Sequence, residues 1–424
     1  MDKIQKYYDI NLEFIFWDEK LWKKYLKKLK RIYRRFESDQ MGRLRLWMDQ
    51  QNMSEYQIQV MAKSILSEIL DRYRPIKVTV PYKKQVFVLP LDENPELCTY
   101  LFYSTRLAIL QTDEQAREWL LQYFMDLRLF YHKNYINFLF LEEEIEQILN
   151  LTSVTYTEVE KSGGILDFIR AHILDGKYIN IHLDEFYLSP KEYYQTRHFV
   201  HENLIYGFDD EKQELYAYGM AERQITKKYT IPYFDFLFAY EKGKLYSFCG
   251  AEYLEQEGYA PILLCQIGTI PEYHFSWKEM QNKLKAFIKP KPEEMVGEDI
   301  HVYGKDIYMW IIRELMGETD YGIDDFRIIQ LLYEQKQCVY RRLQYLQERN
   351  LLPQEQISNF ENYQSVVRNC QSMRMIYLKQ LKKEGALEDP VKRITDERTR
   401  CKLADAIRAM MQKEEEILRL LAVL

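Results

Sequence analysis

Two histidines, His198 and His201, stand at the start of a segment that could support proton transfer. The imidazole has an unperturbed pKa of roughly 6.5, so it can take up and release protons near neutral pH. The segment runs from 197 to 219 as RHFVHENLIYGFDDEKQELYAYG. An apolar run, a polar turn and a second alternating run predict a β-hairpin. His198 and His201 differ in parity, so on a regular strand they face opposite sides.

A thiol is the other group that could do chemistry here. A nucleophilic cysteine reacts as the thiolate, which a helix N-terminus and a neighbouring imidazole stabilise. Cys98 follows the loop DENPEL and opens the apolar run CTYLFYSTRLAIL, which predicts a buried helix just after Pro95. We expect the thiol at the N-terminus of that helix, with His201 on a strand that faces it. The alternative is a structural Cys98, as isolated cysteines usually are.

Residues 76–290, which contain the segments that must position Cys98 and the two histidines, are predicted to form an α+β domain. Short β-rich runs such as KYINIHLDEF and ELYAYGM alternate with helical patterns, and the hairpin points to an antiparallel sheet. Asp209 and Asp210 lie in the hairpin turn, where aspartate is favoured because it hydrogen-bonds the local backbone. Acid–base chemistry by this carboxylate pair is the weaker alternative.

Helical patterns occupy both ends of the chain. Residues 1–75 predict a basic helical region, and residues 300–424 carry three amphipathic stripes that predict a helical bundle. The segment KPKPEEMVGED at 289–299 contains two prolines and mixed charge, which predicts a linker between the central domain and the bundle.

The composition is that of an ordinary globular protein. Its residues are 47% hydrophobic and 29% charged. The length of 424 residues predicts two or three domains. No secretory h-region is visible, and no stretch approaches the ~18 apolar residues of a membrane span. The six cysteines show no C-x-x-C spacing, which argues against a zinc ribbon or a disulfide framework. We therefore expect a cytoplasmic protein without membrane contact.

Several well-known site motifs are absent from the sequence. It contains no P-loop, no G-x-G-x-x-G, no H-E-x-x-H and no G-x-S-x-G, so the common nucleotide, zinc-protease and serine-hydrolase routes are disfavoured. Four histidines are spread over several predicted elements, away from the cysteines: His172, His182, His198 and His201. We accordingly expect neither a metal nor a cofactor.

A known family shares several short motifs with residues 176–220. These motifs are Gly176-Lys177-Tyr178, Asp184-Glu185-Phe186-Tyr187, His-Glu-Asn at 201–203 and Tyr-Gly-Phe-Asp-Asp at 206–210. With them, the segment resembles the papain-like domain of the butirosin-type acyltransferases of bacterial natural-product clusters. It is more distantly similar to bacteriocin-processing cysteine peptidases. The six-residue spacing from His201 to Gly207, followed by Phe-Asp-Asp, is also one found in papain-like cysteine peptidases. The clear match covers 176–220, and a looser one spans 80–420.

The resemblance implies amide formation by a papain-like domain. An acyl group would move from a carrier-protein thioester, through the Cys98 thiol, to an amine, with His201 as general base. The family's usual orienting residue ends the second hairpin strand, where this chain has Tyr218-Gly219. Asn203, on the same strand face as His201, is therefore the candidate orienting residue, with Glu202 on the other face as the alternative. Auxiliary candidates at matching or neighbouring positions are His198, Asp184 and Glu185.

The expected partners follow from the same resemblance. They are an acyl or peptidyl carrier protein and a small-molecule or peptide amine. Carrier proteins are typically acidic, and residues 20–45 hold eleven Lys/Arg against two acids, so this basic helix is the candidate docking site. The alternative is a solvated helix face. A net charge of −6 and the lack of a recognition module disfavour nucleic acid.

Three hypotheses about function follow from these observations. The first is a cytoplasmic acyltransferase or amide-forming enzyme of natural-product biosynthesis, in which a papain-like domain carries the Cys98 thiol. The second is a catalytically inactive papain-like protein that acts as an interaction or scaffold protein of a biosynthetic assembly. The third is a cysteine peptidase that matures a small peptide.

Overall fold

A computed structural model of the protein describes nine stretches of the chain. They are 84–132, 135–140, 144–221, 226–246, 262–291, 293–296, 299–318, 327–385 and 394–423. The chain divides into two compact units, Met1–Pro81 and Tyr82–Leu424, and every described residue belongs to the second. The predicted helical region 1–75 and the basic segment 20–45 therefore lie outside the described residues.

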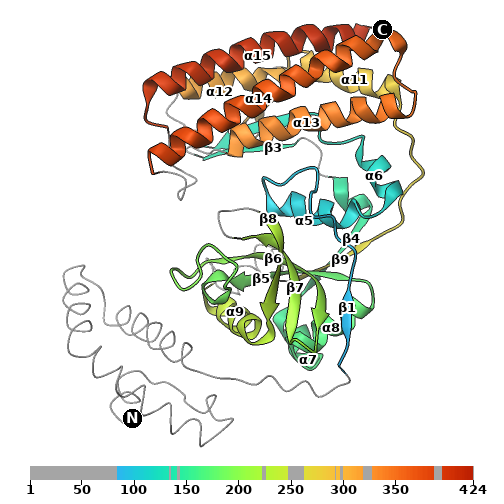
Figure 1. The fold of residues 1–424 in the computed structure, drawn as a ribbon, viewed down its shortest axis with the longest axis vertical. Helices are drawn as coiled ribbons and strands as arrows, with labels where there is room; N and C mark the ends of the chain where they lie inside the picture. Colours follow the sequence, from blue (N-terminus) through green and yellow to red (C-terminus); the bar gives the residue numbers. More distant parts are fainter. Residues whose placement is uncertain are drawn as a thin grey trace, which may run out of the picture. The chain divides into compact units, whose positions relative to one another are not determined.

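A seven-stranded antiparallel sheet contains the strand that begins at Val200 (Figure 1). His201 lies on this strand, whereas His198 precedes it. Six strands follow the order β4-β9-β5-β6-β7-β8, and the short strand β1 pairs with the far end of β6. The strands are β1 (Val86–Val88), β4 (Leu149–Val154), β5 (Tyr178–Asp184), β6 (Val200–Asp209), β7 (Glu214–Met220), β8 (Thr226–Pro232) and β9 (Ile262–Ile267). Together with the helices described below, this sheet confirms the α+β class.

The predicted hairpin is confirmed as β6 and β7. Its register shifts between Ile205 and Gly207, as at a β-bulge. A Cβ added at Gly207 would lie 2.7 Å from the carbonyl oxygen of Phe87, so glycine lets β1 approach β6 this closely. Asp209 accepts hydrogen bonds from the backbone amides of Glu211 and Lys212, at 3.0 and 2.9 Å, which confirms its predicted turn role.

Asp210 has a role that the turn prediction did not include. Its carboxylate is fully buried and accepts hydrogen bonds from the Gln85 amide at 2.9 Å and the Tyr233 hydroxyl at 2.7 Å. It also pairs with Arg170 of α8 (Ile165–Leu174), whose guanidinium lies over the Phe208 ring. Asp210 thus ties the hairpin to the segment before β1, to α8 and to the start of α9 (Tyr233–Tyr246).

Different elements cover the two faces of the large sheet. On one face lie α8, α9 and the short helix η3 (Glu185–Tyr187), with Gly243 of α9 packed on the backbone of Leu183 in β5. On the other face lie α5 (Leu101–Leu110), which contacts β7 and β9, and the segment before it. There the Tyr178 hydroxyl reaches the Pro90 carbonyl, and Lys228 donates to the Leu91 carbonyl at 3.1 Å.

A second antiparallel sheet replaces the predicted linker. Its order is β10-β11-β2-β3, from β2 (Leu127–His132), β3 (Tyr135–Phe140), β10 (Glu294–Val296) and β11 (Asp299–Tyr303). The linker prediction for 289–299 is wrong, because these residues supply β10 and the start of β11, which pairs with β2. Segments on both sides of residue 290 therefore share one sheet.

The three C-terminal stripes form the long helices that were predicted. They are α13 (Arg327–Glu348), α14 (Ile357–Lys383) and α15 (Glu397–Val423). The remaining helices are α6 (Glu114–Leu120), α7 (Tyr156–Lys161), α11 (Trp277–Ile288) and α12 (Ile307–Met316), with the short turns η2 (Glu144–Gln147), η5 (Gly304–Asp306) and η6 (Gln354–Gln356). Within the described part of the chain, no helix combines the length and apolar character that a membrane crossing requires.

A buried ion pair joins the long helices. Nζ of Lys336 on α13 lies 2.9 Å from the Glu414 carboxylate on α15, and both side chains are almost fully buried. The hydroxyls of Tyr308 on α12 and Tyr363 on α14 donate to the same carboxylate, the latter at 2.7 Å. One glutamate therefore connects four helices, as a satisfied buried charge must be both paired and hydrogen-bonded.

Candidate functional site

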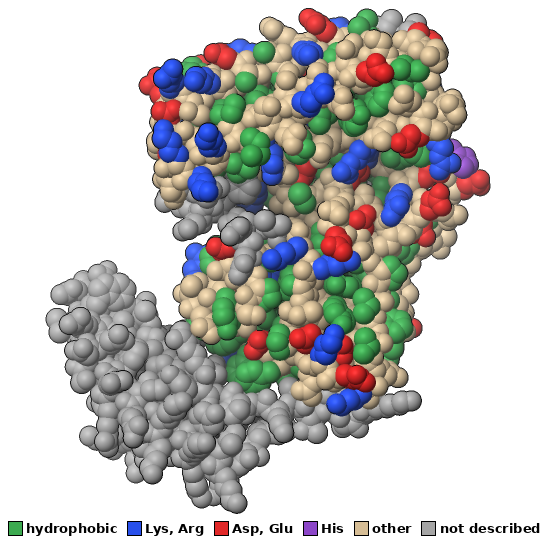
Figure 2. All heavy atoms as spheres, in the orientation of Figure 1, with side chains coloured by type: hydrophobic (Ala, Val, Ile, Leu, Met, Phe, Trp, Pro, Cys, Tyr) green, Lys and Arg blue, Asp and Glu red, His purple; other side chains and the backbone are tan. Residues whose placement is uncertain are grey.

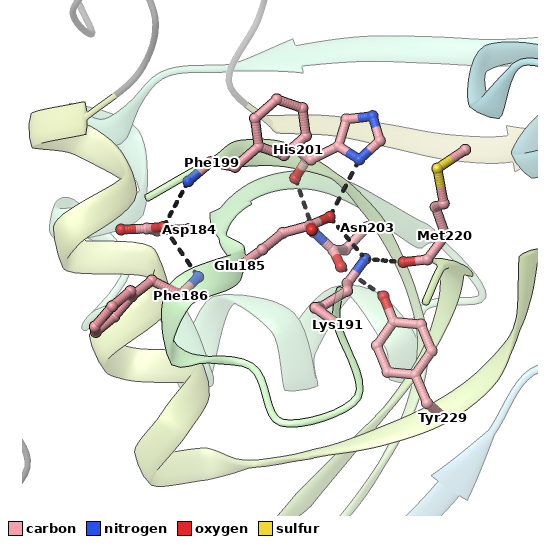
Figure 3. Close-up of polar contacts among 9 residues, drawn as sticks. All are labelled: Asp184, Glu185, Phe186, Lys191, Phe199, His201, Asn203, Met220 and Tyr229. Atoms are coloured by element: carbon pink, nitrogen blue, oxygen red, sulfur yellow. Dashed lines mark hydrogen bonds and ion pairs between the residues drawn. The ribbon is translucent and has the colours of Figure 1, made fainter. Parts of the chain in front are cut away.

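The site is built around the connection between β5 and β6 (Figure 3). These strands pair antiparallel, with Leu183 opposite His201 and Asp184 opposite Val200. The chain between them leaves the sheet at η3 and returns at Val200. Two consecutive acids, Asp184 and Glu185, therefore lie beside the strand end that carries the histidines.

Asp184 closes this connection and holds His198. The residue is fully buried, and its Oδ1 atom accepts the backbone amides of Phe186 and Phe199, both at 3.2 Å. Its Oδ2 atom lies 2.6 Å from Nδ1 of His198, whose ring stacks on Phe186 at 4.5 Å. We interpret His198 as one of the residues that, through Asp184, hold together the two ends of the connection between β5 and β6.

Glu185 is the residue that orients His201. Its Oε1 atom lies 3.2 Å from Nδ1 of the imidazole. The Glu185 side chain is 4% exposed, whereas the His201 side chain is 28% exposed, so the ring reaches solvent while its partner does not. A carboxylate at Nδ1 stabilises the neutral tautomer with hydrogen on Nδ1, which makes Nε2 the proton-accepting nitrogen.

Lys191 lies behind the same carboxylate. Its Nζ is 3.4 Å from Oε1 of Glu185, donates to the Met220 carbonyl at 2.5 Å and lies 5.0 Å from the Tyr229 ring centre. Burial lowers the pKa of Lys191 to about 8, although the attraction of Glu185 opposes the fall. The sequence analysis missed this residue, since nothing in its local pattern marks it.

Asn203 supports the backbone of His201 and not its ring. The residue is fully buried on the same strand face, as predicted. Its Nδ2 atom donates to the His201 carbonyl at 2.8 Å, and its Oδ1 atom accepts the Tyr229 hydroxyl at 2.5 Å. Glu202, the predicted alternative, accepts a hydrogen bond from Asn180 at 3.2 Å on the opposite face. The structure assigns the orienting contact to Glu185 instead of either one.

Cys98 pairs with a residue of the C-terminal helices. Its backbone amide and its thiol both donate to Oε1 of Glu334 on α13, at 3.0 and 3.1 Å. Helix α5 begins only at Leu101, with Tyr100 as its N-cap, so Cys98 precedes the first turn instead of opening it. The predicted buried helix is confirmed as α5, but Cys98 lies two residues before its N-cap and not in its first turn.

The environment of Cys98 disfavours the thiolate. Although the residue as a whole is exposed, burial of the thiol and the neighbouring Glu334 carboxylate raise the pKa of Cys98 to about 12. Burial raises the pKa of Glu334 as well. At neutral pH the thiol therefore keeps its proton and donates it to a hydrogen bond, whereas a nucleophilic cysteine needs a lowered pKa.

Strand register places Cys98 and His201 on opposite faces of the sheet. Tyr218 of β7 pairs with Leu204 of β6, so its side chain points away from the face of His201. Helix α5, which begins three residues after Cys98, contacts β7 and lies on the Tyr218 face, and Cys98 is among the groups that raise the pKa of Tyr218, after burial. Lys228, which pairs with Tyr218 across β7 and β8, reaches the segment before Cys98 from the same face. The structure does not bring the predicted thiol and imidazole together.

Within the described residues, no group of three His, Cys, Asp or Glu side chains could hold a metal ion. No family model matches this chain. A comparison with curated proteins also finds no match. The chemistry of the cluster around His201 is therefore the basis for a functional proposal.

One signal in the sequence could have identified Glu185. Two consecutive predicted strands, KYINIHLDEF and FVHENLIYGF, would pair antiparallel through their connection, which brings residues 183–185 beside residues 199–201. The contact between Cys98 and Glu334 had no such signal, because 236 positions separate the two residues.

Proposed function

We propose that this chain is an acyltransferase that forms an amide directly, with His201 as the general base. An acyl group passes from a carrier-bound thioester to an amine. The observation that carries the proposal is the contact between Nδ1 of His201 and the buried Glu185, because it makes Nε2 the proton acceptor of a solvent-accessible ring. The substrate class and a papain-like fold come from the resemblance of residues 176–220 to the butirosin-type acyltransferases.

The proposed step needs one base and no enzyme thiol. The amine nitrogen attacks the thioester carbonyl carbon while Nε2 of His201 takes the amine proton. The C–S bond then breaks, and the departing thiolate of the carrier receives that proton. One C–N bond forms, one C–S bond breaks, and Glu185 stabilises the imidazolium that exists in between.

Two observations support direct transfer over an acyl-Cys98 intermediate. Burial and the Glu334 carboxylate raise the pKa of Cys98 to about 12, which leaves little thiolate at neutral pH. The segment before α5, which holds Cys98, also lies on the Tyr218 face of the sheet, opposite the face of His201. These observations equally disfavour a cysteine peptidase that uses Cys98.

Amide formation from pantetheine and carrier-bound thioesters with primary amines tests the proposal. Mass spectrometry of the amide and release of the thiol report turnover. We expect His201→Ala to lower kcat by about 10²–10⁴-fold, the range for a general base. Cys98→Ala should keep the rate of the unmodified chain. His274→Ala is the matched control, since the His274 side chain is 77% exposed and pairs only with Glu118 and Glu272 among described residues.

Two results would contradict direct transfer. One is an acyl adduct on Cys98 after incubation with thioester, and the other is a rate that falls in Cys98→Ala as far as in His201→Ala. Glu185→Gln adds a graded variant, because it keeps the side-chain shape but removes the charge that stabilises the imidazolium.

A second candidate function is a non-catalytic interaction protein of a biosynthetic assembly. The observation that favours it is the engagement of the Cys98 thiol by Glu334, which leaves the predicted nucleophile without activation. Carrier binding without turnover, equal in the unmodified chain and in His201→Ala, would select this candidate over the enzyme.

A further inference from the structure

One carboxylate oxygen is shared between two basic groups (Figure 3). The Oε1 atom of Glu185 lies 3.2 Å from Nδ1 of His201 and 3.4 Å from Nζ of Lys191. Lys191 is 1% exposed and Glu185 3% exposed, so water screens this pair weakly. The imidazole therefore faces a buried ion pair instead of a single negative charge.

The net charge beside the His201 imidazole affects its ability to act as a base. A carboxylate alone next to an imidazole favours the imidazolium, which cannot accept a further proton. An ammonium at the same oxygen partly offsets that attraction, because its charge is opposite to that of Glu185. Glu185 can then orient the ring of His201 without holding it in the protonated form.

We propose that Lys191 is a positioning residue that acts through Glu185: its ammonium opposes protonation of the His201 imidazole and so favours the form that can accept a proton. Its role in catalysis rests on the acyl transfer proposed above. The charge coupling between Lys191 and His201 does not, and it can be measured without any substrate.

The surroundings of both groups fit this role. Around Lys191, the described contacts are Glu185 from η3, the Met220 carbonyl from β7 and the Tyr229 ring from β8. The Tyr229 hydroxyl donates to Asn203, and the centre of the Tyr229 ring lies 5.0 Å from the ammonium.

Beside His201, the described neighbours are Glu185 and the Phe199 ring, whose centre lies 5.1 Å from that of the imidazole. The guanidinium of Arg197 lies 5.4 Å from the Phe199 ring centre. Glu185 is thus the one described acid in contact with both His201 and Lys191.

An NMR titration of the full chain with labelled histidine tests the coupling. The chain has seven histidines, and loss of one signal in His201→Gln assigns the ring. We expect Lys191→Met to move the titration midpoint of the His201 signal to higher pH by about one pH unit. A buried charge that contacts the same carboxylate oxygen as the imidazole has an effect of that order. Lys191→Arg keeps the positive charge and should restore the midpoint of the unmodified chain.

Further variants separate this coupling from damage to the fold. Lys191→Gln can still donate to the Met220 carbonyl, and it repeats the measurement if Lys191→Met does not fold. Glu185→Gln should move the midpoint in the opposite direction, to lower pH, because it leaves the ammonium without its counter-charge. Lys177→Met is the matched control, since it removes a partly exposed lysine that pairs with the exposed Asp175.

The outcome is decided by the direction of the change. A folded Lys191→Met or Lys191→Gln chain whose His201 midpoint stays in place, or moves to lower pH, overturns the proposal and leaves Lys191 as a purely structural cation. If the midpoint moves as expected but no thioester is turned over, the coupling stands and the acyltransferase proposal fails separately.

Discussion

The Glu334 carboxylate accepts hydrogen bonds from both the backbone amide and the thiol of Cys98, at 3.0 and 3.1 Å. This contact joins the segment before α5 to helix α13. It also places a negative charge beside the sulfur, in a position where a nucleophilic cysteine would need a positive one. The same residue that anchors the segment thus suppresses the reactivity of its thiol.

Glu334→Gln should make Cys98 more reactive. Glutamine keeps the acceptor oxygen, but it removes the charge that, after burial, is the largest cause of the raised pKa of Cys98. A lower pKa means more thiolate at any pH below it, by tenfold for each unit. We expect iodoacetamide to label Cys98 several-fold faster at pH 8, measured by mass spectrometry. The control is Glu348→Gln, an exposed site on the same helix, and equal rates in both variants would contradict this account.

Asp184→Asn should destabilise the connection between β5 and β6. The asparagine can still accept the amides of Phe186 and Phe199, but its amide group would face His198 without the charge. Loss of a buried, charge-assisted contact costs about 2–4 kcal/mol. Urea denaturation measures the change. Asp175→Asn, at an exposed aspartate, is the control and should leave stability unchanged.

Glu414→Gln should weaken the packing of the helices. It leaves the buried ammonium of Lys336 without its counter-charge, which costs about 3–5 kcal/mol. The adjacent Glu415 provides the control, because it forms partly exposed pairs with Lys305 and Arg419, which are worth about 1 kcal/mol or less. Denaturant titration measures the free energy of unfolding of both variants. An equal decrease in Glu414→Gln and Glu415→Gln would show that the buried pair stabilises the fold no more than the partly exposed pairs do.

Lys191 should leave a signature in the pH dependence of stability. Its pKa is lowered from 10.5 to about 8 by burial, so between these values the unfolded chain binds one more proton than the folded chain. Lys191 therefore makes the free energy of unfolding increase as the pH rises from about 8 to about 10.5. Lys191→Met should show a flatter profile over this interval, whereas an unchanged difference between the two chains would contradict the lowered pKa.

Local sequence patterns determined a large part of the fold. The hairpin at β6 and β7, the turn at Asp209 and the three helices after residue 327 all follow from apolar spacing and turn chemistry, which act within a few residues. Spacing within one strand also selected His201 and placed Asn203 on the same face. These features are set by the alternation of side chains along an element, which needs no distant partner.

The tertiary structure decided which of these residues meet. Whether Cys98 could reach His201 depended on which sheet face α5 covers, and the register of Leu204 with Tyr218 put them on opposite faces. Glu185 orients His201 because β5 pairs with β6. Cys98 contacts Glu334, which lies 236 positions later in the chain. Side-chain periodicity says which way a residue points within its element. The packing of elements against one another decides what lies there.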